Sequence, residues 1–249
     1  MPEKAALALT KPALPPDINR KIGQALHGYG MIESGDRLLV AVSGGIDSLV
    51  LATVLSWWRR KTPVRFDVAA ITIDHGYWRR QPGVADPALV IGEQLRPWGL
   101  ALRRETAWGD AGTARSCFHC ARDRRSQLFA IARDEGYTAI CFGHHCDDLI
   151  DTFFLNLLYG GSISTMRPKQ ILFDGRLKLL RPLAYIDKDE VRTIGELWRL
   201  EPQPNHCPYA HDSRRQTVRE IVAAIERFQP DARRAVFAAL KNVRVEYMP

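Results

Sequence analysis

Residues 38–52, with the sequence LLVAVSGGIDSLVLA, decide how this chain folds. Two apolar runs flank a Gly-Gly turn, a pattern that predicts a buried strand, a tight turn and a helix. Such a turn presents backbone N–H groups at a helix N-terminus, where an anion is favoured. Gly44 and Gly45 let the backbone approach a phosphate closely, and Ser43 and Ser48 can add hydroxyl donors.

Taken alone, a Gly-Gly turn is as often structural as functional in an α/β protein. The hexapeptide of residues 43–48, Ser-Gly-Gly-Ile-Asp-Ser, is far more specific, because it is similar to the PP-loop of the ATP pyrophosphatases. That resemblance implies cleavage of ATP into AMP and pyrophosphate. Asp47 is unusual in an anion site unless a metal ion or a charge-separating reaction needs it. The sequence lacks a Walker-type phosphate loop and a G-x-G-x-x-G turn after the first strand, which excludes those two nucleotide-binding classes.

The composition indicates a cytoplasmic protein with a polyanionic partner. The 249 residues include 35 basic and 28 acidic side chains, which gives a net charge of +7. A hydrophobic content of 46% is enough for a packed core. No stretch approaches the ~20 apolar residues that span a bilayer, and the N-terminus lacks a signal-peptide pattern. We therefore expect no membrane association and a partner such as RNA.

Apolar periodicity predicts an α/β fold with a doubly wound parallel sheet and flanking helices. We expect a flexible tail over residues 1–16 and one domain over residues 17–249, whose C-terminal helices carry the last of the cysteines. The predicted strands cover residues 37–42, 66–73, about 100–105 and 139–142. The predicted helices cover residues 18–29, 47–60, 87–97, 118–135, 147–159, 188–199, 213–228 and 231–241. Capping boxes are predicted at Asp187 with Glu190 and at Ser213 with Gln216.

The residues that follow the predicted strands indicate one pocket. Ligands of doubly wound sheets bind outside the carboxyl ends of the strands. Ser43, Asp74, Gly143 and His144 all fall at such ends. We therefore expect these four residues to share a site.

The strand-to-helix junction at residues 143–152 reads GHHCDDLIDT. Its adjacent carboxylates, Asp147 and Asp148, suit Mg²⁺, which prefers hard oxygen ligands. Helix capping is the alternative, above all for Asp147. His144 and His145 are residue types that ligate zinc, but no ordered partner spacing supports a zinc site.

Five cysteines in a chain expected in the cytoplasm favour metal binding or catalysis over disulfides. Cys117 and Cys120 form a C-x-x-C motif at a predicted helix start, and Cys207 is a third candidate ligand. A four-cysteine zinc site would need a second C-x-x-C, which the sequence lacks. Three thiolates with one open position suit an iron–sulfur cluster. Cys141 is expected in the core, while Cys146 stays open between core and chemistry.

Clusters of basic residues are candidates for RNA contact. They lie at residues 59–61, 79–80, 122–125 and 214–215. We select Arg122 and Arg214 from them as substrate-binding candidates, and Arg181 as a contact to phosphate or RNA. A solvated protein face is the alternative for each cluster, and strand capping is the alternative for Arg181.

Most of the chain resembles the tRNA 2-thiocytidine synthetase family, the 2-thiolation branch of the PP-loop superfamily with its adenine-nucleotide α-hydrolase-like fold. The similar segments are residues 31–37, 43–48, 143–148, 154–156, 159–161 and 181–185, with Cys117, Cys120, Cys207, Arg215 and Gln216. The resemblance implies a 4Fe-4S cluster held by Cys117, Cys120 and Cys207. It also implies an ATP site, with Ser43, Gly44, Gly45 and Ser48 at the pyrophosphate portion, Asp74, Gly143 and His144 at the rest of the nucleotide, and Asp47 and Asp148 at Mg²⁺.

The activity implied by this resemblance is ATP-dependent thiolation of tRNA, forming 2-thiocytidine. ATP adenylates a base carbonyl, AMP becomes the leaving group, and sulfide carried on the open iron attacks the activated carbon. Asp47, Asp148 and the three cysteines are the expected catalytic residues. The expected partners are tRNA and a sulfur donor, either a cysteine desulfurase or free sulfide, and a homodimer is left open.

Two residues and one segment depart from the family pattern. Ile46 stands where the thiocytidine enzymes usually carry Lys, and Asp151 stands where much of the branch carries Glu. Residues 72–76 look closer to lysidine synthetase. Three other functions therefore stay open: a lysidine-type tRNA amine ligase, sulfur transfer to a non-RNA small molecule, and a nucleotide- and RNA-binding module with a structural zinc.

Overall fold

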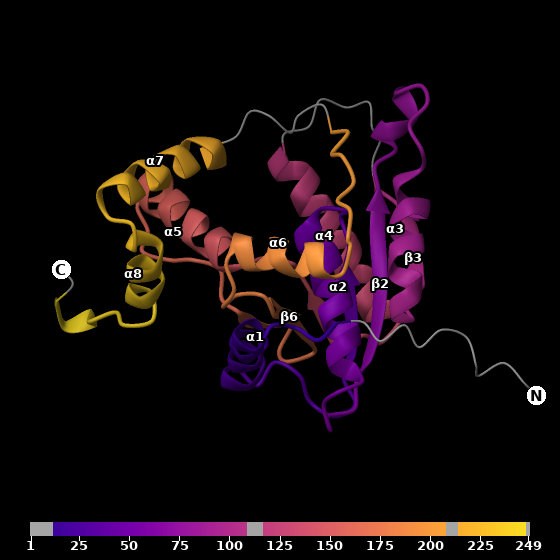
Figure 1. The fold of residues 1–249 in the computed structure, drawn as a ribbon, viewed down its shortest axis with the longest axis horizontal. Helices are drawn as coiled ribbons and strands as arrows, with labels where there is room; N and C mark the ends of the chain where they lie inside the picture. Colours follow the sequence, from indigo (N-terminus) through magenta and orange to yellow (C-terminus); the bar gives the residue numbers. More distant parts are fainter. Residues whose placement is uncertain (1–11, 109–116, 208–213, 248–249) are drawn as a thin grey trace, which may run out of the picture.

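A six-stranded sheet forms the centre of the molecule (Figure 1). The structure is a computed structural model that describes residues 12–108, 117–207 and 214–247. The strands hydrogen-bond in the order β3-β2-β1-β4-β6-β5. They are β1 (Arg37–Ala41), β2 (Asp67–Asp74), β3 (Leu102–Thr106), β4 (Ala139–Cys141), β5 (Lys169–Leu172) and β6 (Leu177–Leu180). Neighbouring strands are parallel except β5 and β6, so the predicted α/β class with a mainly parallel sheet is confirmed.

Every helix expected from the sequence is present, with each end shifted by two residues at most. The α-helices are α1 (Pro16–Gly28), α2 (Ile46–Arg59), α3 (Pro87–Leu95), α4 (Cys117–Asp134), α5 (Cys146–Gly160), α6 (Lys188–Leu197), α7 (Arg214–Phe228) and α8 (Ala232–Ala239). The short 3₁₀ helices are η1 (Tyr77–Arg80), η2 (Arg96–Trp98) and η3 (Val245–Tyr247). The predicted capping box of Asp187 and Glu190 is confirmed at the start of α6, while Ser213 lies outside the described residues. Across the described ranges, no helix combines the length and apolar character needed to cross a membrane.

The hairpin of β5 and β6 has no counterpart among the predicted strands. Each strand has only four residues, and β6 is buried along its whole length, so it lacks the alternation that marks a half-buried strand. The turn between them holds Asp174 at φ 56 and Gly175 at φ 90. An Asp-Gly pair of this kind favours hairpin turns and is the signal that indicates the hairpin.

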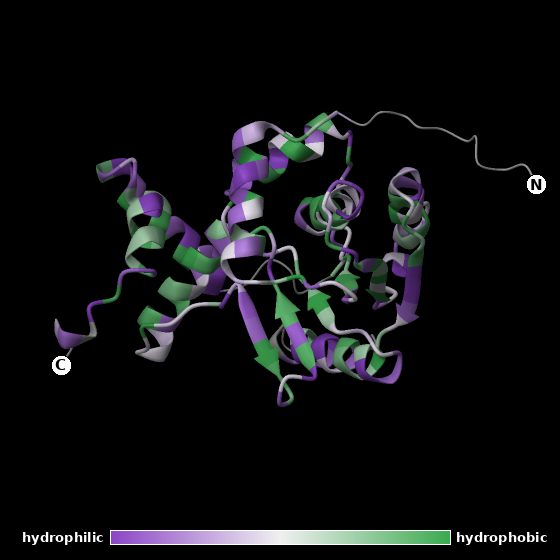
Figure 2. Cartoon of the chain, turned by 90° about the horizontal axis from the view of Figure 1, so that it is seen from below, coloured by the Kyte–Doolittle hydropathy of each residue, from purple (hydrophilic) through white to green (hydrophobic). Residues whose placement is uncertain are grey.

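Helices cover both faces of the sheet, because successive residues of a strand point to opposite sides. Leu38 and Val40 of β1 join a large core cluster with α1, α2, α3 and α6. Leu39 joins a smaller cluster with Ile71 of β2 and Leu128 of α4. This arrangement is the double winding that the sequence predicts. In Figure 2 the inner strands are mostly hydrophobic, whereas β3, at one edge, is hydrophilic.

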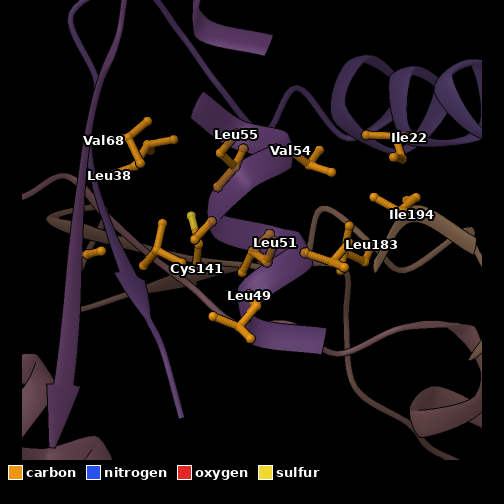
Figure 3. Close-up of a cluster of buried hydrophobic side chains, with 14 of the residues drawn as sticks. Ile22, Leu38, Leu49, Leu51, Val54, Leu55, Val68, Cys141, Leu183 and Ile194 are labelled. Atoms are coloured by element: carbon orange, nitrogen blue, oxygen red, sulfur yellow. The ribbon is translucent and has the colours of Figure 1, made fainter. Parts of the chain in front are cut away.

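Helix α2 runs through the larger core cluster and is buried on all sides. Residues 48–56 are all buried. Figure 3 shows the side chains of this helix between the strands on one side and Ile22 of α1 and Ile194 of α6 on the other. A helix in such a position has a continuous apolar sequence rather than an amphipathic one. Cys141 of β4 is fully buried in the same cluster, so its predicted core position is confirmed.

Helices α5, α7 and α8 form a group beside the sheet, on the left in Figure 1. Ile150 of α5 packs against Val218 and Val222 of α7, and all three are buried. Cys207 lies in the irregular segment between α6 and α7, so it precedes the last two helices rather than lying on them. Residues 1–11 of the tail expected over residues 1–16 lie outside the described residues. The expectation is wrong for the remainder, because Leu14 is buried in the large core cluster and Pro16 begins α1.

A buried ion pair joins β1, β4 and β6 near their N-terminal ends. Lys178 Nζ donates to Asp36 Oδ2 at 2.6 Å, and Thr138 Oγ1 donates to Asp36 Oδ1 at 2.7 Å. Burial alone would raise the pKa of Asp36. The hydrogen bonds from Lys178, from the Glu33 backbone and from Thr138 outweigh burial and hold the pKa below its ordinary value.

Asp36→Ala should lower the free energy of unfolding by about 3 kcal/mol, because it leaves the charge of Lys178 buried without its main partner. Urea unfolding at neutral pH measures this loss. Asp134→Ala is the control, since Asp134 pairs with Arg133 at an exposed position and its removal should leave the unfolding midpoint unchanged. Equal midpoints for the wild type and both variants would contradict a stabilising role of Asp36.

The same variant has a pH dependence of defined sign. A carboxyl group whose pKa is lowered on folding stabilises the folded state above its unfolded pKa, and this contribution is lost as the pH falls through the folded pKa. The advantage of the wild type over Asp36→Ala should therefore be constant in neutral and weakly acidic buffer. It should shrink as the pH falls below the ordinary value of 3.8.

Candidate active site

The carboxyl ends of β1, β2 and β4 border a cavity of about 260 Å³. One wall is the loop after β1 with the first turn of α2, another is the loop after β4 with the first turn of α5, and α4 contributes a third. Parallel strands bring these distant segments together, because their carboxyl ends lie at one edge of the sheet. The predicted site residues that line the cavity are Ser43, Gly45, Asp47, Ser48, Gly143, His144 and Asp148.

Two serines hold the phosphate loop, residues 43–48, in shape. The backbone N–H of Ser43 donates to Ser48 Oγ at 3.1 Å, and Ser48 Oγ donates to the carbonyl of Gly45 at 2.8 Å. Gly44 has a φ of +88, which an L-residue rarely adopts. Helix α2, of 14 residues, follows the turn directly, so the positive end of its dipole favours an anion here.

Gly143 allows the end of β4 to lie directly against the phosphate loop. A Cβ placed on Gly143 would be 2.8 Å from the backbone C and O of Asp47 and 3.0 Å from the backbone N of Ser48. All three of these atoms are backbone, which cannot swing aside as a flexible side chain can. The position therefore requires glycine.

Three carboxylates surround the buried imidazole of His145. Its Nδ1 lies 3.3 Å from Asp147 Oδ2, and its Nε2 lies 3.4 Å from Asp148 Oδ2 and 3.8 Å from Asp47 Oδ1. Burial lowers the pKa of His145, but the neighbouring carboxylates outweigh burial, and the resulting pKa is raised. The raised pKa favours the protonated form of His145, and its Nε2 lies near both carboxylates on the cavity wall, Asp47 and Asp148.

Asp147 fastens other helices to the site instead of lining the cavity. Its Oδ2 accepts a hydrogen bond from the backbone N–H of Lys188, the first residue of α6, at 2.8 Å, and its Oδ1 accepts one from Arg233 Nη1 of α8 at 2.7 Å. Burial would raise the pKa of Asp147, but His145, the Lys188 N–H and Arg233 lower it to about 2. Asp147 thus hydrogen-bonds the N-terminus of α6, whereas the capping contact at the start of α5 is made by Asp148, whose Oδ2 accepts a hydrogen bond from the His145 N–H at 3.1 Å.

His144 faces the cavity as a neutral side chain. Burial lowers the pKa of His144 to about 4. Its Nδ1 is buried and has no hydrogen-bond partner among the described residues. A neutral imidazole has one donor and one acceptor nitrogen, so His144 can hydrogen-bond a polar ligand in this cavity.

The loop after β2 contacts the surroundings of two of the cysteines predicted as ligands. His75 Nε2 lies 3.6 Å from Cys120 Sγ. Gln81 Oε1 lies 2.8 Å from Nδ1 of His206, the residue before Cys207. The segment of residues 75–81 therefore brings the start of α4 and the segment before α7 to the carboxyl end of the sheet.

Cys120 and Cys207 are free, partly exposed thiols, as metal ligands must be before loading. Cys117 begins α4 one turn before Cys120, and its side chain is not among the described ones. In the part of the chain that the structure describes, no group of three His, Cys, Asp or Glu side chains is arranged to hold a metal ion. Cys146 differs from Cys120 and Cys207, because burial raises the pKa of its thiol to about 12 and keeps it protonated.

Residues 14–225 match the protein family described as PP-loop domain. The chain belongs to the PP-loop family. Similar curated proteins include the tRNA-cytidine(32) 2-sulfurtransferase of Pseudomonas paraeruginosa, 32% identical over 95% of this chain and 87% of that protein. The protein of the same name from Acinetobacter baumannii is 34% identical over 91% of this chain and 76% of that protein. These matches place the chain in the tRNA 2-thiolation branch of the PP-loop family.

The fold is also found in a solved structure. The U34-tRNA thiolase NcsA from Methanococcus maripaludis, solved with its 4Fe-4S cluster, matches with a TM-score of 0.73 and 21% sequence identity. The match covers 94% of this chain and 79% of that chain. The α/β architecture predicted from the sequence is thus shared with this solved structure.

Arg124 lines the cavity of this PP-loop protein, whereas Arg122, selected from the same basic cluster, is exposed. The Arg124 Nε is buried and has no hydrogen-bond partner among the described residues. A guanidinium in this position is available to a phosphate. Arg124 follows Cys120 by four residues, so both lie on one side of α4, and this spacing is the sequence signal for its role.

Asp74 ends β2, as expected, but is not on the cavity wall. Its carboxylate accepts a hydrogen bond from the Gly76 backbone at 2.7 Å and pairs with Arg79 and Arg104. Burial would raise the pKa of Asp74, and these partners together lower it. Its contact with a nucleotide stays a prediction.

The two remaining arginines selected from the sequence also lie away from the cavity wall. Arg181 is buried just after β6 and donates a hydrogen bond to the carbonyl of Arg167. Arg214 is exposed at the start of α7, with its guanidinium 4.9 Å from the ring centroid of Tyr159. Their contacts with RNA stay predictions.

Gly143→Ala should displace the phosphate loop, because the added Cβ would lie within 2.8 Å of the Asp47 backbone. We expect a loss of about 1–3 kcal/mol in the free energy of unfolding and a loss of up to about 100-fold in ATP-dependent turnover. Urea unfolding and pyrophosphate release measure the two effects. Gly160→Ala is the matched control, since a Cβ at Gly160 meets nothing within 4 Å. Wild-type turnover by Gly143→Ala would show that the loop tolerates the displacement.

Proposed function

We propose that this chain is an ATP-dependent tRNA sulfurtransferase that replaces a base carbonyl oxygen by sulfur and forms 2-thiocytidine. The observation that carries the proposal is the position of α4. This helix begins at the C-x-x-C motif and supplies Arg124 to the wall of the phosphate-loop cavity. One rigid element thus joins the cysteines to the place where ATP binds. The relatives named tRNA-cytidine(32) 2-sulfurtransferase support the substrate.

ATP binds with its phosphates at the start of α2. Backbone N–H groups of the phosphate loop and the Ser43 hydroxyl are its donors, while the Ser48 hydroxyl donates to the Gly45 carbonyl and keeps the loop in shape. Arg124 supplies a charge opposite the triphosphate. Gly143 and the neutral His144 line the same cavity and are assigned to the rest of the nucleotide. Asp74 supports the site from outside by holding the loop that follows β2.

Asp47 and Asp148 are assigned to Mg²⁺. Both line the cavity, and their carboxylate oxygens are the hard ligands that Mg²⁺ prefers beside a polyphosphate. The contacts to His145 hold the two carboxylates near one another. A metal ion held there supplies positive charge where pyrophosphate leaves.

The chemistry follows from the poor leaving ability of a carbonyl oxygen. That oxygen attacks the α-phosphorus of ATP, a new P–O bond forms, and the bond to pyrophosphate breaks. Sulfur then forms a bond to the base carbon, and the oxygen departs with AMP. The phosphate loop and Arg124 contribute by aligning the triphosphate and by stabilising the charge that develops on it.

A 4Fe-4S cluster is assigned to Cys117, Cys120 and Cys207. Such a cluster supplies reactive sulfur at an iron atom without a cysteine ligand. The free thiols of Cys120 and Cys207, both next to the loop after β2, fit this assignment.

The partners of this reaction are tRNA and a sulfur donor. Exposed Arg122 and Arg214 are assigned to tRNA contact, in agreement with the net charge of +7, and Arg181 is assigned to contact with phosphate or RNA. The proposed sulfur donor is a cysteine desulfurase or free sulfide.

Replacing Cys117, Cys120 or Cys207 by Ser should abolish both the brown colour of anaerobically prepared protein and the formation of 2-thiocytidine. Each change removes one thiolate from the proposed ligand set. Absorption spectra, iron analysis and mass spectrometry of tRNA nucleosides from cells that contain only the variant are the measurements. Cys146→Ser is the control and should keep both properties. A colourless, iron-free wild-type protein that still forms 2-thiocytidine would refute the cluster.

Asp47→Ala should stop the conversion of ATP to AMP and pyrophosphate while the cluster is retained. The expected loss is at least about 100-fold, the scale for removing one charge-stabilising group from a reacting centre. Pyrophosphate release with tRNA present is the measurement, and the absorption spectrum reports the cluster. Asp189→Ala, which changes an exposed carboxylate of α6, is the control. Turnover that persists in Asp47→Ala would disprove the assigned role.

A further inference from the structure

The carboxylate of Asp47, on the wall of the phosphate-loop cavity, is paired with Lys188 of α6. Lys188 Nζ lies 2.5 Å from Asp47 Oδ1, and the two side chains are 34% and 32% exposed. Lys188 lines a neighbouring cavity of about 940 Å³ and is not on the wall of the phosphate-loop cavity. The ion pair therefore stands at the boundary between the two cavities.

The backbone of Lys188 is fixed independently of its side chain. Its N–H donates to Asp147 Oδ2 at 2.8 Å. In the same turn of α6, Glu190 N–H donates to Asp187 Oδ1 at 2.9 Å, and Asp187 N–H donates to Glu190 Oε2 at 3.0 Å. Most surface ion pairs contribute little to folding stability, because two flexible side chains must be held in one geometry. The backbone of Lys188 is instead held in place at the N-terminus of α6, so less of its freedom is lost when the ion pair forms.

Packing between α2 and α6 sets the distance between the two charged side chains. Ile46, the residue before Asp47, points at α6, since a Cβ on Gly195 would lie 2.6 Å from Ile46 Cδ1. Ile46 packs against the core and offers no charge to a phosphate. The cation in closest contact with Asp47 within the described ranges therefore comes from α6, with His145 farther away at 3.8 Å.

The geometry points to Lys188 as a positioning residue of the phosphate loop: it neutralises and orients Asp47, so that a triphosphate can enter the loop before Mg²⁺ is bound. This inference rests on the proposed function, because it requires ATP in the cavity. A carboxylate beside a triphosphate repels it, and the repulsion is strongest without the metal ion. Lys188 thus acts through Asp47, and its effect is greatest on the metal-free nucleotide.

Calorimetric titration of the full-length protein with ATP, first in EDTA and then in excess Mg²⁺, tests the inference. Lys188→Met should weaken ATP binding in EDTA by about tenfold, or ~1.4 kcal/mol, and clearly less in Mg²⁺. Adenosine, which has no phosphate, should bind equally well to Lys188→Met and the wild type. Lys188→Arg should bind ATP like the wild type. Arg192→Met is the matched control, since Arg192 is on the same helix and pairs with exposed Asp189.

A double-mutant cycle with Asp47→Asn separates an action through Asp47 from a direct contact with phosphate. The effect of Lys188→Met in EDTA should disappear in the Asp47→Asn background. An undiminished effect there, equal ATP affinities of Lys188→Met and the wild type, or an equal loss for adenosine would each overturn the role of Lys188 while ATP binding stands. Failure of the wild type to bind ATP at all would overturn the proposed function together with this inference.

Discussion

The backbone of Asp47 lies against Gly143, with no room for a methyl group between them. This contact joins the loop after β1 to the end of β4, its neighbour in the sheet. Helix α2 begins at this contact and α5 begins shortly after it, at Cys146. Their first turns therefore face one cavity, and Asp47 and Asp148 lie near the same imidazole, His145. The contact between the Asp47 and Gly143 backbones thus sets the distance between the phosphate loop and the first turn of α5. It also sets the distance between the two carboxylates assigned to Mg²⁺.

When a site that binds a polyanion also contains carboxylates, nearby cations must offset the negative charge of those carboxylates. Asp47 is matched by Lys188 of α6, and Asp147 is matched by Arg233 of α8. His145 lies among them with a raised pKa and contacts Asp148 as well. Each cation comes from a different part of the chain, so α6 and α8 complete the electrostatics of the site although they lie outside the sheet. Asp147, next to the cavity residue Asp148, therefore links α5 to both α6 and α8.

The parts of this structure that the sequence predicts well are those formed by neighbouring residues. The strand, turn and helix of residues 38–52 can be predicted because they depend on local contacts and on a continuous apolar pattern. That pattern is continuous because residues 48–56 of α2 are all buried. The hairpin of β5 and β6 is missing from the prediction because its strands are short and lack alternation. The contact of Lys188 with Asp47 spans 141 positions and leaves no local pattern. The sequence correctly predicts Asp74 at a strand end. It does not predict the ion pair of the Asp74 carboxylate with Arg104, because Arg104 belongs to the adjacent strand β3.

The separation between ATP activation and sulfur delivery, as proposed, is set by the sheet. The phosphate loop follows β1, while the loop that contacts Cys120 and His206 follows β2, the parallel neighbour of β1. Adjacent strands lie about 4.8 Å apart, so the two loops start one strand spacing from each other. Helix α4 then spans both places, with Cys120 in its first turn and Arg124 one turn later, and it is fixed to the sheet through buried Leu128 and Ala132. A shift of α4 would move the proposed cluster ligand and the cavity arginine together, which keeps their spacing constant.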